Sequence, residues 1–357
     1  MRTEVEPVLG RYCSVTLTYE GPGFLEYVVT GGSVEPVFPE VFRELVGAGY
    51  QPILVRRDGQ EIVRVFKVGI GGFSRATYYA LAVATAVAIA FTGYLSSLSF
   101  LECLGKPTEV LLPTALFTIS VLVPLALHEL GHFTVSRATG TPTPLPLFIP
   151  APVVSPLGTF GAVIAVRFLP RDRRTLAFLG LSGPAVGTVA SLVAMIATLR
   201  LSPTLRPDEL ACPDVSPIGF VPVATYLALR AGLVPVGEGE IVLLHPAALA
   251  SMILLLIHFA NLLPIGQLDG GHVVRSLTTI EVHRAISMAV PVALIALAVL
   301  LPTYRWLGFF AILAILIGGF RPHIGYANQV SRLTASERAT IASLYVLLLA
   351  LTAPVPI

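Results

Sequence analysis

The run LALHELGH places His128, Glu129 and His132 inside a long apolar stretch. In a helix, residues four positions apart lie on one face, so both imidazoles reach a single metal ion while the glutamate stands beside it. Ionisable side chains are costly to insert in a segment that otherwise suits lipid, and such residues usually mark function. The pattern therefore predicts a hydrolytic zinc site that is buried in a membrane.

A second polar cluster, NLLPIGQLDGGH, lies at the end of a later apolar stretch. Catalytic zinc takes three protein ligands and keeps one position open for water, so a third ligand must come from outside the HELGH. Asp269 is the best candidate, because it is a carboxylate at the end of an apolar helix. Gly270 and Gly271 let the backbone turn sharply and approach another helix closely. A helix break at Pro264 is tolerated at membrane depth only where the backbone lines protein or a cavity.

The charges of these residues suggest a division of roles. Zinc lowers the pKa of its bound water to about 7, which produces hydroxide at neutral pH. Glu129 is adjacent but is not a ligand, and we expect it to take a proton from water and to deliver it to the leaving amine. Asn261 precedes Asp269 in the same cluster, and its amide is expected to hold a peptide carbonyl or to stabilise the oxyanion.

The composition of the 357-residue chain indicates a polytopic membrane protein. Hydrophobic residues make up 55% of the sequence and charged residues only 12%, with a mean hydropathy of +0.82, whereas a soluble domain carries about 25% charged residues. The formal net charge of +2 and the lack of a basic cluster with interleaved aromatic residues exclude nucleic acid as a partner. We therefore expect an α-helical polytopic protein that lies in the lipid bilayer.

Seven apolar stretches are candidate membrane spans, and we expect about six or seven transmembrane helices, each of which needs roughly 20 apolar residues. The stretches cover residues 77–98, 110–135, 175–199, 247–263, 285–301, 306–319 and 341–353. The last three are short, so tilted or interfacial placements stay open for them. No internal repeat is evident, which argues against a transporter built from inverted repeats.

Residues 1–72 have a different pattern, typical of a small α+β soluble domain. The predicted elements are strands at 11–19 and 25–30, a helix at 39–48, and strands at 51–57 and 60–68. GPG and RDG are expected at the two turns, and the glycine-rich hinge GIGGF follows. This domain contains no catalytic constellation. Residues 73–357 are expected to form the membrane domain, with the catalytic core at about 108–280.

The charges of the loops predict the orientation of the chain in the membrane. The loop after the second span holds five arginines, Arg137, Arg167, Arg171, Arg173 and Arg174. The loop at 200–245 holds three arginines against five acidic residues. The rule places the N-terminal domain and the ends of spans two and four in the cytoplasm, so that the HELGH lies near the cytoplasmic side of its helix. We expect the plasma membrane of a prokaryote. Cys103 and Cys212 fall on the predicted outer side; a disulfide between them stays open, but two unpaired thiols are the simpler expectation.

The two polar clusters together resemble the site-2 protease family of intramembrane zinc metalloproteases. Members pair HExxH on one transmembrane helix with N-x-x-P-x-x-x-x-D-G-G on a later one, and both motifs are complete here, in that order. The resemblance covers about residues 108–280. It implies that His128, His132 and Asp269 bind one zinc ion per chain, that Glu129 is the catalytic acid/base, and that Asn261 contacts the substrate. The implied activity is regulated intramembrane proteolysis, the hydrolysis of peptide bonds in or next to transmembrane helices of a substrate protein.

The segment PLGTFGAVIAVRF, residues 156–168, resembles the glycine-containing β-hairpin that the family carries near its active site. We expect a turn at Gly158 and Gly161, a strand at 162–168, and a membrane-associated hairpin whose free edge adds the substrate as an extra strand. The candidate substrate-binding residues are Gly158, Thr159, Phe160 and Gly161. The run SGPAVG at 182–187 resembles a small-residue packing segment, and Gly187 stands where many members carry Asn, so we assign it packing only.

Two features differ from the commoner members of the family. The loop at 200–245 is too short for a PDZ-like insert, and the N-terminal domain is an addition whose role the sequence does not indicate.

Three alternatives to the protease interpretation stay open at this point. A metal transporter would use the same His/Asp constellation as a transit site, although it ordinarily needs polar residues on both sides of the metal. A catalytically silent membrane-protein binder would be free to lose Glu129. Another membrane HExxH peptidase would take a downstream glutamate as third ligand, and Glu281 is a poor candidate because it lies outside the paired motif. Nothing in the sequence indicates an oligomeric state.

Several polar residues also have purely structural explanations. Asp269 would cap a helix, and Asn261 would satisfy backbone groups freed near Pro264. His258 lies on the face of Asn261, where structural polarity is the simpler role, and His272 is expected to be a polar residue at a helix start rather than a fourth ligand. The remaining histidines outside the motif stand at predicted span ends, where interfacial placement explains them: His245, His283 and His323.

Overall fold

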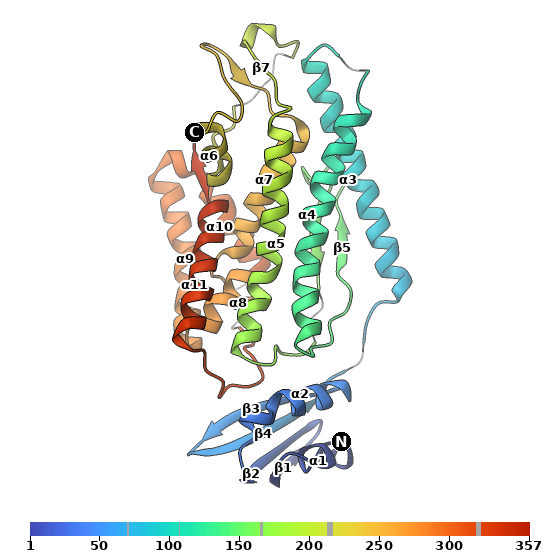
Figure 1. Cartoon of the computed structure of the whole chain (residues 1–357), viewed down its shortest axis with the longest axis vertical. Coiled ribbons are helices and arrows are strands. Elements are labelled where there is room, and N and C mark those ends of the chain that lie inside the picture. The colour runs from blue at the N-terminus through green and yellow to red at the C-terminus, as the bar shows by residue number, and fades with distance from the viewer. Residues whose placement is uncertain (70, 107, 165–166, 213–216, 319–322) are drawn as a thin grey trace.

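The computed structural model describes residues 1–69, 71–106, 108–164, 167–212, 217–318 and 323–357. The chain has a small sheet unit at its N-terminus and a bundle of long helices beyond it (Figure 1). The sheet unit lies at one end of the bundle, so the molecule is elongated along the helix axes.

The N-terminal unit is a four-stranded antiparallel sheet with two helices. Its elements are α1 (Arg2–Leu9), β1 (Ser14–Gly21), β2 (Phe24–Gly31), α2 (Phe38–Gly47), β3 (Tyr50–Arg57) and β4 (Gln60–Lys67). The strand order is β1-β2-β4-β3, and the turn between β3 and β4 has positive φ at Asp58 and Gly59, as the RDG sequence predicts. The predicted β-β-α-β-β order is present. α1 was not expected, because Pro7 interrupts its short sequence.

Apolar spacing explains how α2 covers the sheet. Its buried residues are Phe38, Val41, Phe42, Leu45 and Val46, which recur at the three- and four-residue spacing of one helix face. This face forms a common core with apolar side chains of α1, β2, β3 and β4.

The bundle contains seven apolar helices at the seven predicted positions. They are α3 (Arg75–Cys103), α4 (Leu111–Ala138), α5 (Arg173–Leu199), α7 (Pro246–Leu262), α9 (Ile280–Leu300), α10 (Leu307–Gly318) and α11 (Ala335–Thr352). In the described part of the chain, five are long and apolar enough to cross a membrane: α3, α4, α5, α9 and α11. α7 and α10 are shorter apolar helices, and residue 319, the predicted end of the sixth span, lies outside the described residues.

Short elements connect the long helices. They are β5 (Leu147–Pro150), β6 (Thr159–Val163), β7 (Thr204–Leu205), β8 (Phe220–Pro222), α6 (Val223–Arg230), β9 (Ile241–Val242), α8 (Asp269–Leu277) and β10 (Pro354–Pro356), with 3₁₀ turns at Glu35–Val37, Pro207–Glu209 and Pro302–Tyr304. The sequence did not predict α6 or α8 as separate helices. α8 begins at Asp269, directly after the break that Pro264 introduces.

The hairpin near the bundle lies earlier in the chain than the sequence indicated. β6 covers Thr159–Val163 and pairs with β5, whereas a strand was expected at 162–168; residues 165 and 166 lie outside the described part. Gly158 explains the shift, because its positive φ forms a turn and a Cβ there would lie 2.6 Å from the backbone oxygen of Ala88 on α3. The close contact of Gly158 with α3 therefore makes β6 start at the next residue, Thr159.

A disulfide joins Cys103, at the end of α3, to Cys212 in the loop after α5. The backbone of Ala211 also donates a hydrogen bond to the carbonyl oxygen of Cys103 (3.0 Å). The expectation of two unpaired thiols was therefore wrong. The two cysteines are 109 residues apart in sequence, so only the packing of the bundle brings them together, at the end away from the N-terminal sheet (Figure 1).

The N-terminal unit contacts the bundle through the edge strand β3. The Leu54 N–H donates to the Ala327 carbonyl (2.9 Å), and the Leu54 carbonyl accepts from the Gln329 N–H (2.9 Å). The buried side-chain oxygen of Gln51 accepts a hydrogen bond from the Leu169 N–H (2.7 Å). Two bundle segments are therefore bonded to the sheet unit.

Candidate metal centre

α4 carries the two histidines and the glutamate of the HELGH in its C-terminal half. His128 and Glu129 are buried, and the rings of His128 and His132 lie 4.8 Å apart between centroids. Their Nε2 atoms are 3.1 Å apart. The spacing of four residues thus points both rings to one place, as the sequence predicts.

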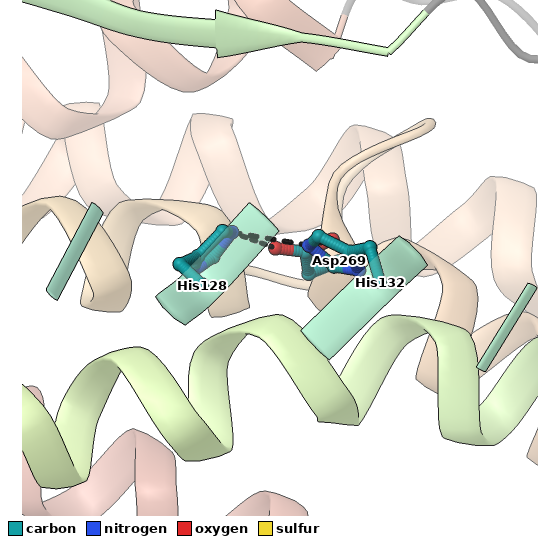
Figure 2. Close-up of side chains that lie close together, drawn as sticks. All are labelled: His128, His132 and Asp269. Atoms are coloured by element: carbon teal, nitrogen blue, oxygen red, sulfur yellow. Dashed lines mark hydrogen bonds and ion pairs between the residues drawn. The ribbon is translucent and has the colours of Figure 1, made fainter. Parts of the chain in front are cut away.

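α8 brings Asp269 to the same place, and the close-up shows it next to His128 and His132 (Figure 2). Its two oxygens lie 3.5 Å from the Nε2 of His128 and 3.4 Å from the Nε2 of His132. The ligand atoms of the three residues all lie within 4.8 Å of one another. The predicted trio is therefore assembled, although its members come from two helices far apart in sequence.

The donor set and its spacing fit a zinc ion. A tetrahedral ion with bonds of about 2.0–2.1 Å separates its ligand atoms by roughly 3.3 Å. The two imidazole nitrogens here are 3.1 Å apart, and each has one oxygen of the Asp269 carboxylate within 3.5 Å, Oδ2 for His128 and Oδ1 for His132. Two imidazoles and one carboxylate are a ligand set of catalytic zinc sites, which leave a fourth position for water. The residues present therefore fit the metal that the sequence predicts.

A backbone hydrogen bond determines the tautomer of His132. Its Nδ1 lies 2.8 Å from the Leu179 carbonyl oxygen on α5. A carbonyl only accepts, so Nδ1 carries the hydrogen and Nε2 presents a lone pair toward Asp269. Such second contacts orient metal-binding histidines in general.

His258 on α7 supports the ring of His128. The two rings stack with centroids 5.1 Å apart and an interplanar angle of 8°, and the Nε2 of His258 lies 3.3 Å from the Ser191 hydroxyl. The sequence assigned His258 structural polarity and missed this contact with the centre. The signal was present in Gly187, because a small residue there leaves room for a ring beside His128.

The small residues of α5 are what allow the rings to fit. A Cβ at Gly183 would overlap the ring of His132, and a Cβ at Gly187 would lie 2.7 Å from the ring of His258 and 3.0 Å from the Cβ of His128. The packing role predicted for SGPAVG corresponds to these contacts.

A cavity of about 570 Å³ opens onto the three metal-binding candidates. Glu129 and Asn261 line it, and neither side chain has a hydrogen-bond partner in the described part of the chain. A carboxylate and an amide are therefore available beside the candidate metal position.

The hairpin residues named from the sequence lie beside this cavity rather than in it. Thr159 is buried and its hydroxyl donates to the Ile149 carbonyl (2.8 Å), whereas Phe160 is 65% exposed. Among the described residues, the cavity lining does not include Gly158, Thr159, Phe160 or Gly161. The part of this segment that does line it is Ala162, Val163 and Ile164.

Comparison with known proteins agrees with the geometry. The chain is similar to the protein named probable zinc metalloprotease EGY1, chloroplastic, of Arabidopsis thaliana, with 30% identity over 184 residues, which is 49% of this chain and 31% of the relative. It is also similar to probable zinc metalloprotease EGY2, chloroplastic, of the same plant, with 28% identity over 46% of this chain and 28% of the relative. The EGY1 protein of Oryza sativa subsp. japonica is 30% identical over 46% of this chain and 27% of its own length.

The chain spans less than a third of the length of these relatives. No solved structure matches the chain. Peptidase family M50 matches residues 116–301, which include both halves of the metal centre and amount to more than half of the chain. As the paired motifs predict, this chain belongs to peptidase family M50, the site-2 protease family.

Proposed function

We propose that the protein is an intramembrane zinc metalloendopeptidase that hydrolyses peptide bonds in or next to transmembrane helices of substrate proteins. The observation that carries the proposal is the assembly of two imidazole nitrogens and one carboxylate within 3.5 Å of one another beside Glu129. This cluster lies among helices apolar enough to cross a membrane. The relatives that are named as probable zinc metalloproteases support the same chemistry.

His128, His132 and Asp269 would hold one zinc ion. When bound, zinc supplies Lewis-acid activation of a water molecule at neutral pH. Glu129 is placed beside the trio, and its carboxylate has no hydrogen-bond partner among the described residues, so it accepts the proton from water and later returns it to the leaving amine. The Asn261 amide, which lines the same cavity, donates a hydrogen bond to the substrate carbonyl.

The substrate is expected to bind in an extended conformation. β6 pairs with β5 on one side, and Ala162, Val163 and Ile164 line the cavity. An extended peptide that pairs with this edge would lie within reach of the metal centre, because strand addition satisfies the substrate's backbone groups inside the membrane. The hairpin would then bind the substrate through its backbone N–H and C=O groups, and Thr159 would hold the two strands of the hairpin together.

We propose that the N-terminal unit lies in the cytoplasm and the disulfide on the outer side of the plasma membrane of a prokaryote. The disulfide and the sheet unit lie at opposite ends of the bundle (Figure 1). Disulfides persist in oxidising compartments and are rare in the cytosol, and Cys13 in the sheet unit is free. The disulfide thus supports the same orientation as the loop arginines, with the sheet unit on the cytoplasmic side.

Zinc content and cleavage of a transmembrane substrate in detergent test the proposed function. Wild type is expected to contain about one zinc and to cleave, and a chelator is expected to stop cleavage. Glu129→Gln is expected to keep its zinc and to lose activity by about 10²–10⁴-fold. Glu109→Gln, an exposed glutamate in the loop before α4, is the matched control and should cleave like wild type. Zinc binding without cleavage of several substrates by wild type would instead favour a metal transporter or a silent binder, which zinc flux in liposomes distinguishes.

A further inference from the structure

A second group of histidines lies beside the metal centre. His272 is three residues after Asp269 on α8, so the two side chains share one helix face. His272 and His323 both line the cavity, and their rings lie 4.8 Å apart between centroids. The ring of His283 lies edge-on to that of His323, with centroids 5.3 Å apart.

The hydrogen bonds in this group determine which ring nitrogens carry hydrogen. The Gly325 backbone N–H donates to the Nδ1 of His323 (2.9 Å), so this Nδ1 is an acceptor without hydrogen. A neutral imidazole then carries its hydrogen on Nε2. The Nε2 of His323 lies 2.9 Å from the Nδ1 of His272 and donates to it. The same rule, applied again, leaves His272 with its hydrogen on Nε2.

The Nε2–H of His272 is not used by the fold. It has no hydrogen-bond partner in the described part of the chain, and it is not among the buried polar atoms shut off from the cavity. His272 is also not a fourth ligand, because the described group of metal-binding atoms contains only His128, His132 and Asp269. The chain therefore orients a neutral N–H donor on the cavity wall next to the metal centre.

We propose that His272 donates a hydrogen bond from Nε2 to the carbonyl oxygen of the scissile peptide, and that His323 is the positioning residue that fixes its tautomer. The proposal rests on the proposed function of this centre. Negative charge develops on that oxygen as water attacks, and a preorganised donor stabilises it more in the transition state than in the bound substrate. The Asn261 amide would be the second donor, which gives the oxygen two partners.

Activity of variants tests this role, with zinc content measured for each. His272→Phe keeps a ring but removes the donor, and we expect normal zinc content, a kcat about 10²-fold lower and little change in KM. His272→Gln offers an amide donor in its place and should recover roughly tenfold of the loss. His323→Phe should lower kcat by about tenfold, and the double variant should be no slower than His272→Phe, since the two residues act as one unit. His245→Phe, at the start of α7 and in contact with neither His272 nor His323, is the control.

The tautomers themselves provide a readout apart from activity. The chain has seven histidines, so ¹⁵N NMR of histidine-labelled protein can resolve them, with the single variants giving the assignment. We expect His272 and His323 both in the Nε2–H form, and in His323→Phe a mixture of forms at His272.

Four results would overturn the proposal: an Nδ1–H form at His272, full activity of His272→Phe, loss of zinc from that variant, or multiplicative losses in the double variant. If wild type itself cleaves no substrate, the proposed function fails and this role with it. If wild type and His272→Phe are both active, the role of His272 is wrong and the proposed function stands.

Discussion

The N-terminal sheet unit and the helical bundle both have apolar cores, but the bundle also buries the ionisable side chains of the metal centre. The core of the sheet unit is formed by aromatic and aliphatic residues such as Tyr27, Phe38 and Phe42. The bundle exposes large apolar residues such as Val83 and Leu111, because lipid rather than water surrounds it. Burial therefore means something different in the two regions. An apolar interior is the ordinary outcome in water, whereas a buried ionisable group within the bundle calls for a function.

Two buried glutamates show how the regions differ. Glu61 in the sheet unit is 8% exposed and Glu129 in the bundle is 7% exposed. The carboxylate of Glu61 accepts hydrogen bonds from the Ser33 hydroxyl, the Val34 N–H and Arg56, whereas Glu129 has no such partner in the described part of the chain. A satisfied buried carboxylate stabilises its fold, and an unsatisfied one that faces a cavity is available for chemistry.

The largest difference between the two regions is expected when one glycine in each is replaced by alanine. A Cβ at Gly183 on α5 would overlap the ring of His132, whereas a Cβ at Gly47 on α2 has no neighbour within 4 Å. Gly183→Ala is expected to lose its zinc and all cleavage. Gly47→Ala, the matched control, should keep both and gain up to about 1 kcal/mol of stability. Zinc content by elemental analysis measures the outcome, and a zinc-loaded, active Gly183→Ala would mean that the rings have room to move.

Replacing each glutamate by glutamine should lower the stability of one variant, Glu61→Gln, and the activity of the other, Glu129→Gln. Glu61→Gln leaves buried donors without their charged acceptor, so we expect a loss of about 1–3 kcal/mol in the free energy of unfolding and unchanged cleavage. Glu129→Gln removes a buried, unpaired charge, so the metal-free protein should unfold at the same or a higher temperature while cleavage is lost. Thermal denaturation in detergent and a cleavage assay measure the two effects, and an unstable Glu129→Gln would contradict the distinction.

The same carboxylate makes the sheet unit sensitive to acid. Burial raises the pKa of Glu61, but hydrogen bonds from Arg56, Val34 and Ser33 more than offset it, so its pKa in the fold lies below the usual 4.5. Its contribution to stability is therefore complete above the unfolded pKa and is lost as the pH falls below about 4.5 through the lower folded value. The protection of residues 50–67 against hydrogen exchange, relative to the intrinsic rate at each pH, should decrease over this range in wild type. In Glu61→Gln exchange should be faster already at pH 7 and should change less on acidification.

The sequence was informative wherever the decisive pattern is local. The spacing of His128 and His132 in one helix, and the complete Asn261–Asp269 motif, predicted residues that the fold assembles at one place. Among the described residues, the apolar stretches predicted the positions of α3, α4, α5, α7, α9, α10 and α11, with ends that differ by up to six residues, but not the shorter α6 and α8. These features depend on helix periodicity and on length, which neighbouring residues alone determine.

The features that the sequence missed depend on contacts between distant segments. The stacking of His258 on His128 needs α7 and α4 side by side, and the Cys103–Cys212 disulfide needs two distant loops to meet. The start of β6 follows from the contact of Gly158 with α3. No periodicity within one segment encodes such partners, so they became evident only with the packing.

The contact between the two regions gives the smallest expected effect and the finest test of their difference. Gln51 on β3 accepts the Leu169 N–H, and Leu169 and Pro170 line the cavity of the metal centre. Gln51→Leu keeps the volume but leaves that N–H without its acceptor, so we expect a loss of about 1 kcal/mol, faster hydrogen exchange at 167–170 and a few-fold change in KM. Gln60→Leu, at the exposed first residue of β4, is the control.

The KM of Gln51→Leu shows whether the sheet unit contributes to the structure of the catalytic cavity or is only attached to the bundle. Leu169 and Pro170 belong to the bundle by sequence, yet the core of the sheet unit includes Phe168 just before them. A change in KM with Gln51→Leu would mean that a soluble fold helps to shape the wall of a cavity within the bundle. Unchanged kinetics with faster exchange would mean that the contact only tethers the two regions, and that the centre is shaped by the bundle alone.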